Sequence, residues 1–269
     1  MSFRFSYRLG LLLLALAILP VLGERQESEP AELEGIGIDD RAGAQLPLDL
    51  VFRDSRGEMR ELGEFFDGEH PVLLSLVYYN CPMLCNLVLD SMIAGLRDLE
   101  WSAGEEFSIL TVSIDPRDSV EDSAQKRSHL LASYGREGSE DAWKLLTASS
   151  EVTRALADSL GFRYRFDEET GEYLHAAGIF ALSPDGKLSR CLYGVDYPER
   201  DLRLSLLEAG EGRIGKARDH FLLYCFAYDP EQGAYSLQAM NIMRAGGSLT
   251  LLLLGAFLLK RKRRADESL

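Results

Sequence analysis

The sequence feature that most constrains the fold is the transition at residues 73–86, LLSLVYYNCPMLCN. A continuous apolar run rich in β-prone residues indicates a buried strand, and a helical pattern follows it at once. Pro82 suits the first turn of a helix, because its ring presets φ and its missing N–H would lack a partner there anyway. We therefore predict that Cys81 lies at a strand-to-helix junction and that Cys85 lies one turn further on about the same face.

Two cysteines at such a junction are suited to metal binding or to redox chemistry. The positive end of the helix dipole favours a thiolate over a thiol, and the thiolate is the form that binds metals and attacks disulfides. Packing alone, which would make both cysteines inert core residues, does not explain their spacing of one turn at a helix start. Four cysteines in 269 residues are also too few for a disulfide scaffold. We therefore expect a functional site here.

Composition narrows the classes of partner. The formal net charge of the chain is −14, which disfavours nucleic acid as a partner. Hydrophobic residues make up 46% of the chain, which is ample for a packed core. A length of 269 residues allows one large domain or two small ones.

Both ends of the chain carry patterns typical of membrane targeting. Residues 1–23 combine two arginines with a short apolar run, which favours a signal peptide over the alternative, an uncleaved anchor. Residues 245–264 join an apolar run to five consecutive cations, which predicts a C-terminal transmembrane helix with a stop-transfer sequence. An amphipathic surface helix is the alternative for that segment. Both patterns place the intervening chain on the extracytoplasmic (periplasmic) side of a membrane.

Between the two ends, strands alternate with helices and the pattern closes in a β-hairpin followed by a helix. This order is typical of an α/β fold with a mixed sheet flanked by helices. Because the cysteines stand at the start of the first long helix, the thioredoxin fold is the natural candidate. The expected segments are a signal peptide or anchor (1–23), an acidic linker (24–45), the thioredoxin-like domain (46–208), an aromatic juxtamembrane segment (209–244) and the C-terminal anchor (245–264).

Turn and capping residues set the expected elements of the domain. Asp118 or Ser119 is the expected cap of a helix that closes at Gly135, and residues 183–186 are the expected turn of the final hairpin. Strands are expected at 48–53, 72–79, 106–114, 143–147, 162–166, 177–182 and 187–193. Helices are expected at 82–99, from the cap to 135, from about 150 to 161, and at 198–208.

Among the four histidines, His175 is the best candidate for a third ligand beside the two sulfurs. It precedes the final hairpin in a loop that, in a thioredoxin-like sheet, lies beside the cysteine helix. Two thiolates and an imidazole form a soft, three-coordinate set that suits Cu(I), whereas zinc would require a fourth ligand or a bound water. His70, at a strand entrance, and His129, in a polar helix, are expected to be structural or solvated.

The other two cysteines have weaker signals. Cys191 alternates within a strand and is most simply a small core residue, although a disulfide with Cys225 is compatible with an oxidising compartment. His220 and Cys225 are five residues apart and do not share a helical face well, so a second metal site there is not favoured. The sequence assigns no role to Cys191, Cys225 or His220.

Over about residues 46–208 the chain resembles the Sco/SenC family of membrane-tethered copper chaperones for cytochrome c oxidase assembly. The resemblance rests on CPMLC at residues 81–85, on VSIDPRD at 112–118, and on His175 upstream of FALSPDG at 180–186. The three motifs occur in that order, and a Cys-x-x-x-Cys at a strand-to-helix junction is fairly specific.

The resemblance implies a thioredoxin-like fold in which Cys81, Cys85 and His175 bind one copper ion, most simply Cu(I). It also implies a role in supplying copper to the binuclear copper site of oxidase subunit II, or in reducing the cysteines of that site. Two features depart from the family. Leu174 stands where many members carry an acidic residue, and the aromatic segment and C-terminal anchor are additions. These additions make another copper enzyme the alternative partner.

Two other functions are compatible with the sequence. An extracytoplasmic thiol–disulfide oxidoreductase would use Cys81 as the attacking thiolate and Cys85 as the resolving one, with no need for His175. A peroxiredoxin-like peroxidase shares the fold, but Tyr78 occupies the position expected for its active-site threonine. Copper delivery is the preferred hypothesis. It makes the protein a metallochaperone rather than an enzyme, with redox-active cysteines because Cu(I) loading requires reduced thiols.

Overall fold

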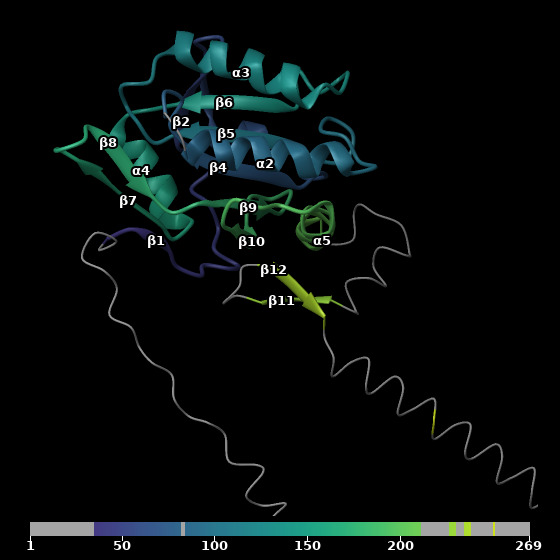
Figure 1. Cartoon of the computed structure of the whole chain (residues 1–269). Helices are drawn as coiled ribbons and strands as arrows, with labels where there is room; N and C mark the ends of the chain where they lie inside the picture. The colour runs from purple at the N-terminus through teal and green to yellow at the C-terminus, as the bar shows by residue number, and fades with distance from the viewer. Residues whose placement is uncertain (1–34, 82–83, 211–225, 230–233, 238–249, 251–269) are drawn as a thin grey trace, which may run out of the picture. The chain divides into compact units, whose positions relative to one another are not determined.

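The computed structural model describes residues 35–81, 84–210, 226–229, 234–237 and 250. Its centre is a seven-stranded mixed sheet in the order β10-β9-β4-β5-β6-β2-β3 (Figure 1). Strands β4, β5 and β6 are parallel, while β9 and β2 flank them in the antiparallel sense. The strands are β2 (Val51–Asp54), β3 (Met59–Glu61), β4 (Val72–Val77), β5 (Ser108–Ser113), β6 (Trp143–Thr147), β9 (Gly178–Leu182) and β10 (Leu188–Tyr193).

Helices cover this sheet. The helix that follows the cysteines, α2, contacts both α3 and α5, while α3 packs on β6 and α5 packs on β9 and β10. A fourth helix, α4, packs on β7 of a smaller sheet. The predicted thioredoxin-like arrangement of a mixed sheet flanked by helices is therefore confirmed. The helices are α2 (Leu84–Asp98), α3 (Val120–Tyr134), α4 (Ser150–Ser159) and α5 (Glu199–Ala209), with a 3₁₀ turn, η2 (Leu62–Phe65).

The central strand β4 explains the apolar run that opened the sequence analysis. All six of its residues are buried, because it pairs with β5 on one side and with β9 on the other and is covered on both faces. Its position brings the chain to the cysteines at the carboxyl end of the strand. The largest fully buried side chains of the surrounding core are Trp143, Tyr134, Tyr197, Phe52, Phe107, Phe162 and Phe180.

The predicted limits of α3 are confirmed by its caps. Ser119 accepts a hydrogen bond from the backbone of Asp122, and the Asp122 side chain accepts one in return from the backbone of Ser119. At the other end Gly135 adopts φ 67°, a left-handed conformation that glycine takes without steric cost. Strand β2, in contrast, begins at Val51 rather than at residue 48, because the N–H of Leu50 bonds back to the carbonyl of Pro47.

A second, three-stranded sheet has the order β1-β7-β8. It consists of β1 (Gly37–Ile38), β7 (Phe162–Asp167) and β8 (Glu172–His175). The prediction that His175 lies in a loop is wrong, since it is the last residue of β8 and pairs with Tyr164 of β7. The turn between the two strands closes at Gly171, which has φ 74°. Ordered structure also begins before residue 46, because β1 lies within the segment expected as a linker.

The chain ends lie largely outside the described residues. Segment 1–23 and, apart from Thr250, segment 245–264 are not described, and among the residues that are, no helix has the length and apolar character needed to cross a membrane. Within the expected aromatic segment 209–244, the structure describes one antiparallel pair that was not predicted. It is formed by β11 (Phe226–Asp229) and β12 (Ala234–Leu237).

Candidate metal and redox centre

Cys81 and Cys85 lie where β4 gives way to α2, as predicted. Cys81 follows the three residues after the strand, and Cys85 lies in the first turn of the described helix. The backbone N–H of Cys85 points to the sulfur of Cys81, with 3.4 Å between the two atoms. Cys85 is fully buried, and Cys81 keeps 6% of its surface exposed. Both are thiols in the structure, which leaves them available to a metal or to oxidation.

His175 reaches the same point from the other sheet. Its Nε2 atom lies 3.2 Å from the sulfur of Cys85, although the two residues are 90 positions apart in the chain. The imidazole is buried and contacts the rings of Tyr78 and Phe162, whose centroids are 6.1 Å and 5.8 Å from its own. The prediction that His175 lies beside the cysteine helix is therefore confirmed, even though a strand rather than a loop carries it.

The hydrogen bonds of His175 define its tautomer. Its Nδ1 atom lies 2.9 Å from the carbonyl oxygen of Ala176, which can only accept, so Nδ1 carries the proton. The lone pair of Nε2 therefore points at the sulfur of Cys85. Burial lowers the pKa of His175, which favours the neutral ring. A neutral imidazole whose other nitrogen is held by a carbonyl is the form in which histidine binds metals.

The prediction that the helix dipole favours a thiolate is wrong for Cys85. A hydrogen bond with Cys81, followed by burial, raises the pKa of the Cys85 thiol well above its usual range. The positive charge of Lys126 acts in the opposite direction and is the weaker influence. The hydrogen bond with Cys81 and the burial of the sulfur together favour the protonated thiol, against the direction expected of the helix dipole. The Cys85 thiol is thus a donor to His175 until a metal ion displaces its proton.

A tyrosine next to the site was not singled out by the sequence as a contact. The hydroxyl of Tyr78 donates to Oε2 of Glu172 across 2.5 Å, which joins the end of β4 to the start of β8. Burial, together with hydrogen bonds to Cys81 and Glu172, raises the pKa of Tyr78 and keeps it protonated. No single-sequence signal could have paired these two residues, which are 94 positions apart.

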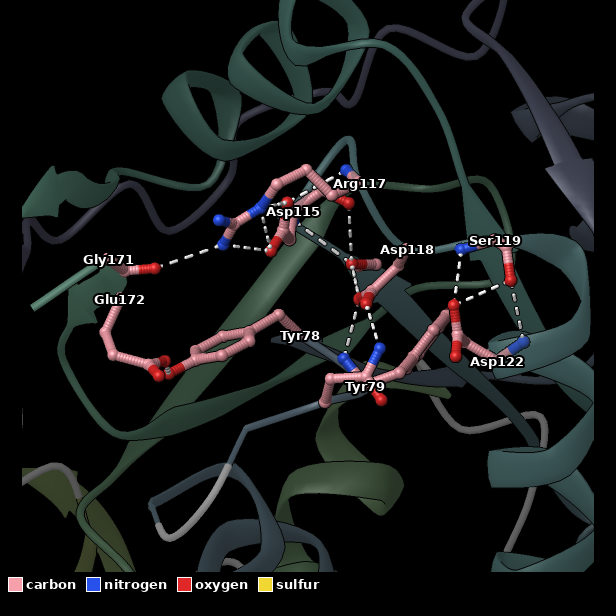
Figure 2. Close-up of polar contacts among 11 residues, drawn as sticks. Tyr78, Tyr79, Asp115, Arg117, Asp118, Ser119, Asp122, Gly171 and Glu172 are labelled. Carbon is pink, nitrogen blue, oxygen red and sulfur yellow. Dashed lines mark hydrogen bonds and ion pairs between the residues drawn. The ribbon is translucent and has the colours of Figure 1, made fainter. Parts of the chain in front are cut away.

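The segment between β4 and Cys81 is held by a carboxylate. Asp118 accepts hydrogen bonds from the backbone N–H of Tyr79 at 2.7 Å and from the side chain of Asn80 at 3.0 Å (Figure 2). The hydroxyl of Ser113 donates a third, at 2.5 Å. The sequence offered Asp118 and Ser119 as alternative caps of α3, and the structure shows that Ser119 is the cap. The sequence signal for the role of Asp118 in holding Tyr79 and Asn80 was its place in the VSIDPRD motif.

Of the remaining candidate residues, the structure describes His70, His129 and Cys191. His70 bonds to Asp67, with 2.7 Å between Nδ1 and Oδ2, and His129 is exposed on α3, as predicted for structural or solvated residues. Cys191 is a buried core residue of β10, also as predicted. His220 and Cys225 lie outside the described residues, so the alternatives that involve them stay predictions.

The contacts among Cys81, Cys85 and His175 join these residues in pairs but do not group all three around one metal position. In the described part of the chain, no three His, Cys, Asp or Glu side chains are grouped so that they would hold a metal ion as they stand. Cys85 contacts both Cys81 and His175, so it is the shared member of the two pairs. Two ligands at about 2.3 Å and 2.0 Å from one metal, about 120° apart, would be separated by about 3.7 Å. For both atoms to bind one metal ion, the 3.2 Å between Cys85 Sγ and His175 Nε2 would have to increase by about 0.5 Å.

Comparison with known proteins places these features in context. The model of the SCO1/SenC family matches residues 45–203. Two structures from Aquifex aeolicus VF5, classed as electron transfer and electron transport proteins, are each 27% identical and cover 62% of this chain. The match covers 94% and 98% of those chains, with TM-scores of 0.54 and 0.50.

A third structure supports the fold alone. It is BsSco, described as a member of the Sco family of cytochrome c oxidase assembly proteins that contains a disulfide switch. It is 20% identical and matches over 64% of this chain and 97% of its own, with a TM-score of 0.50. No curated protein sequence matches the chain.

Proposed function

The chain belongs to the SCO1/SenC family, and from that premise we propose that it carries one Cu(I) ion to a respiratory oxidase. The ligands would be the sulfurs of Cys81 and Cys85 and the Nε2 atom of His175. The observation that carries this proposal is the contact between Cys85 and His175, in which an imidazole lone pair is directed at a buried thiol across 3.2 Å. A residue needed only for thiol exchange has no reason to be supplied from a separate sheet.

The chemistry of the donor set supports copper over other metals. Two thiolates and one neutral imidazole suit soft Cu(I), which accepts three ligands. Zinc would require a fourth ligand or a bound water beside these three. The buried aromatic rings of Tyr78 and Phe162 exclude water from the histidine side, which would protect Cu(I) from oxidation.

The acceptor we propose is the binuclear copper site of oxidase subunit II, with another copper enzyme as the alternative. Family membership supports an acceptor in oxidase assembly. The apolar and cationic patterns at residues 1–23 and 245–264 support a membrane-anchored domain on the extracytoplasmic side, and the proposal puts the acceptor site on the same side. The domain would then exchange its ion in the same compartment as its acceptor.

Thiol reduction is the second candidate. Oxidation of Cys81 and Cys85 to a disulfide releases two electrons and two protons, which would convert an acceptor's disulfide to two thiols. The side chains of Cys81 and Cys85 are hydrogen-bonded to each other, which places the two sulfurs near enough to favour such a step. The Aquifex relatives, classed as electron transfer proteins, support it as well. The two roles are compatible, because only the reduced pair binds Cu(I).

The proposal is tested by copper binding to the full, reduced chain. We expect one Cu(I) per chain, retained against a competing chelator. Cys81→Ser and Cys85→Ser should each abolish stable loading, because each removes a soft ligand from a three-coordinate site. The matched control is Cys191→Ser, which alters a buried cysteine in β10 and should keep full stoichiometry. Unchanged binding in the Cys81→Ser/Cys85→Ser double variant would exclude this site.

A further inference from the structure

The turn that follows β5 contacts both halves of the proposed copper site. This turn comprises residues 115–118, Asp-Pro-Arg-Asp, and the N–H of Asp118 closes it by bonding to the carbonyl of Asp115. Figure 2 shows its side chains extending in two directions, toward Tyr79 on one side and toward Gly171 on the other. We call these residues the 115–118 turn.

One side of the 115–118 turn is anchored to the cysteines. The Asp118 carboxylate holds the Tyr79 N–H and the Asn80 side chain, and Asn80 is the residue before Cys81. Asp118 is itself only 7% exposed, so these bonds are made in a desolvated setting where they are strong. The turn is therefore fixed in place relative to the segment that leads into Cys81.

The other side reaches the hairpin formed by β7 and β8. Nε and Nη2 of Arg117 grip the buried carboxylate of Asp115 at 2.7 to 2.9 Å, and the same Nη2 donates to the carbonyl of Gly171 at 3.2 Å. The guanidinium also lies over the rings of Phe166 and Tyr173, at 5.1 Å and 5.8 Å from their centroids. Arg117 thus contacts the tip and one face of the hairpin.

These contacts of Arg117 are important because the β7–β8 hairpin lies outside the seven-stranded sheet. In the described part of the chain, strand β8 pairs with β7 alone, while β7 also pairs with β1 and packs on α4. The chain link to β9 sets the approximate place of His175, but no backbone ladder aligns β8 with β4 or α2. Besides Arg117, the Tyr78–Glu172 hydrogen bond and the ring contacts of Tyr78 with Tyr173 and His175 join β8 to the cysteine side. The alignment of His175 with Cys85 therefore depends on side chains.

We propose that Arg117 is a positioning residue for the copper site, which holds the β7–β8 hairpin so that His175 faces Cys85. This inference rests on the proposed function for its consequence, a higher affinity for Cu(I). The planar fork of arginine is required, because one guanidinium must reach the Asp115 carboxylate and the Gly171 carbonyl together while it lies over two rings. Lysine, a single point charge, can neutralise Asp115 but cannot at the same time bond to the Gly171 carbonyl and lie over the two rings.

The choice of variant follows from that difference. Arg117→Gln would leave the Asp115 carboxylate buried without its counter-charge, which endangers the fold itself. Arg117→Lys keeps the positive charge beside Asp115 and so preserves the fold. It removes the guanidinium contacts with Gly171, Phe166 and Tyr173 of the hairpin. The matched control is Arg56→Lys, in an exposed ion pair with Asp141 on the turn between β2 and β3.

The first test needs no copper. In the full chain, hydrogen exchange of the β8 amides should become several-fold faster in Arg117→Lys, while exchange in α2 stays as in the parent. Arg56→Lys should leave both regions unchanged. Equal exchange of β8 in Arg117→Lys and the parent would overturn the positioning role. This result would stand whether or not the chain proves to bind copper.

The second test measures Cu(I) affinity in a double-mutant cycle. Arg117→Lys should weaken binding about tenfold, at the low end of the loss found when residues that orient a ligand are changed. In a His175→Ala background the same change should have no effect, because there is no imidazole left to position. An equal loss in both backgrounds would overturn the proposal. Absence of Cu(I) binding by the parent itself would instead refute the proposed function and leave the exchange test decisive.

Discussion

The two halves of the proposed copper site are built in different ways. Cys81 and Cys85 follow a strand with hydrogen-bonded neighbours on both sides and enter a helix that packs on two others. His175 ends a strand that pairs on one side only, in a small separate sheet. The cysteine half is held by backbone ladders and the core, whereas the histidine half is held by side chains. Such a division would let the histidine move away from the sulfurs while the rest of the domain stays folded.

The largest effect that we expect from this difference concerns His175→Ala. The variant should fail to metallate the copper-site domain of an oxidase subunit II, because the third ligand is lost. Its Cys81–Cys85 disulfide should form and be reduced at parental rates, since exchange proceeds through sulfur alone. Both quantities are measured on the same preparation, by copper transfer and by thiol trapping.

The same experiment separates the two candidate functions. Full metallation of the acceptor by His175→Ala would refute delivery and favour the reductase. Because the imidazole contacts Cys85, the thiolate fraction of the variant must be measured in parallel. A loss of exchange together with a loss of metallation would contradict the independence of the two halves.

A smaller effect is expected on global stability. Leu74→Ala, in the fully buried centre of β4, should lower the free energy of unfolding by about 2–5 kcal/mol. Phe166→Ala, on the hairpin and 41% exposed, should cost about 1 kcal/mol or less while it speeds hydrogen exchange in β8. Denaturant unfolding and hydrogen exchange measure the two quantities. Similar losses of global stability in both variants would mean that the halves share one cooperative core.

The smallest expected effect is a dependence on pH. Burial lowers the pKa of His175 in the folded chain, so the unfolded chain takes up the proton first as pH falls. The free energy of unfolding should therefore decline as pH drops below about 6.5, the usual histidine pKa, down to the lowered value. Titration of the His175 ring by NMR should give a midpoint below that of a histidine in an unstructured peptide. A midpoint at or above that reference would contradict a buried, neutral imidazole.

Local signals were sufficient for most elements of the fold. Strand β6 spans the predicted residues 143–147, and α3 ends at the predicted Gly135, because a short apolar run and a left-handed glycine are read within a few residues. Ser119 and Asp122 form a capping box that needs nothing beyond their own turn. The family motifs additionally indicated that Cys81, Cys85 and His175 belong to one site.

Non-local effects account for the errors. Strand β8 has four residues, pairs with β7 and follows an acidic turn. A strand this short has too few residues for its alternating pattern to be recognised in the sequence, so it could not be predicted without its pairing to β7. The protonation of Cys85 was mistaken for a similar reason. The helix dipole is a local property, whereas the raised pKa of Cys85 follows from its hydrogen bond with Cys81 and from burial of the sulfur by the residues that pack around it.

The sequence by itself determined the α/β fold, the position of the cysteine pair at the end of a buried strand, and the candidacy of His175. These depend on periodicity, capping and motif order, which are properties of neighbouring residues. The tertiary structure alone decided that His175 directs Nε2 at Cys85, that Cys85 is a thiol, and that Arg117 and Asp118 join the two halves. Each of these depends on contacts between residues distant in the chain, whose geometry and solvation exist only once the two sheets have packed.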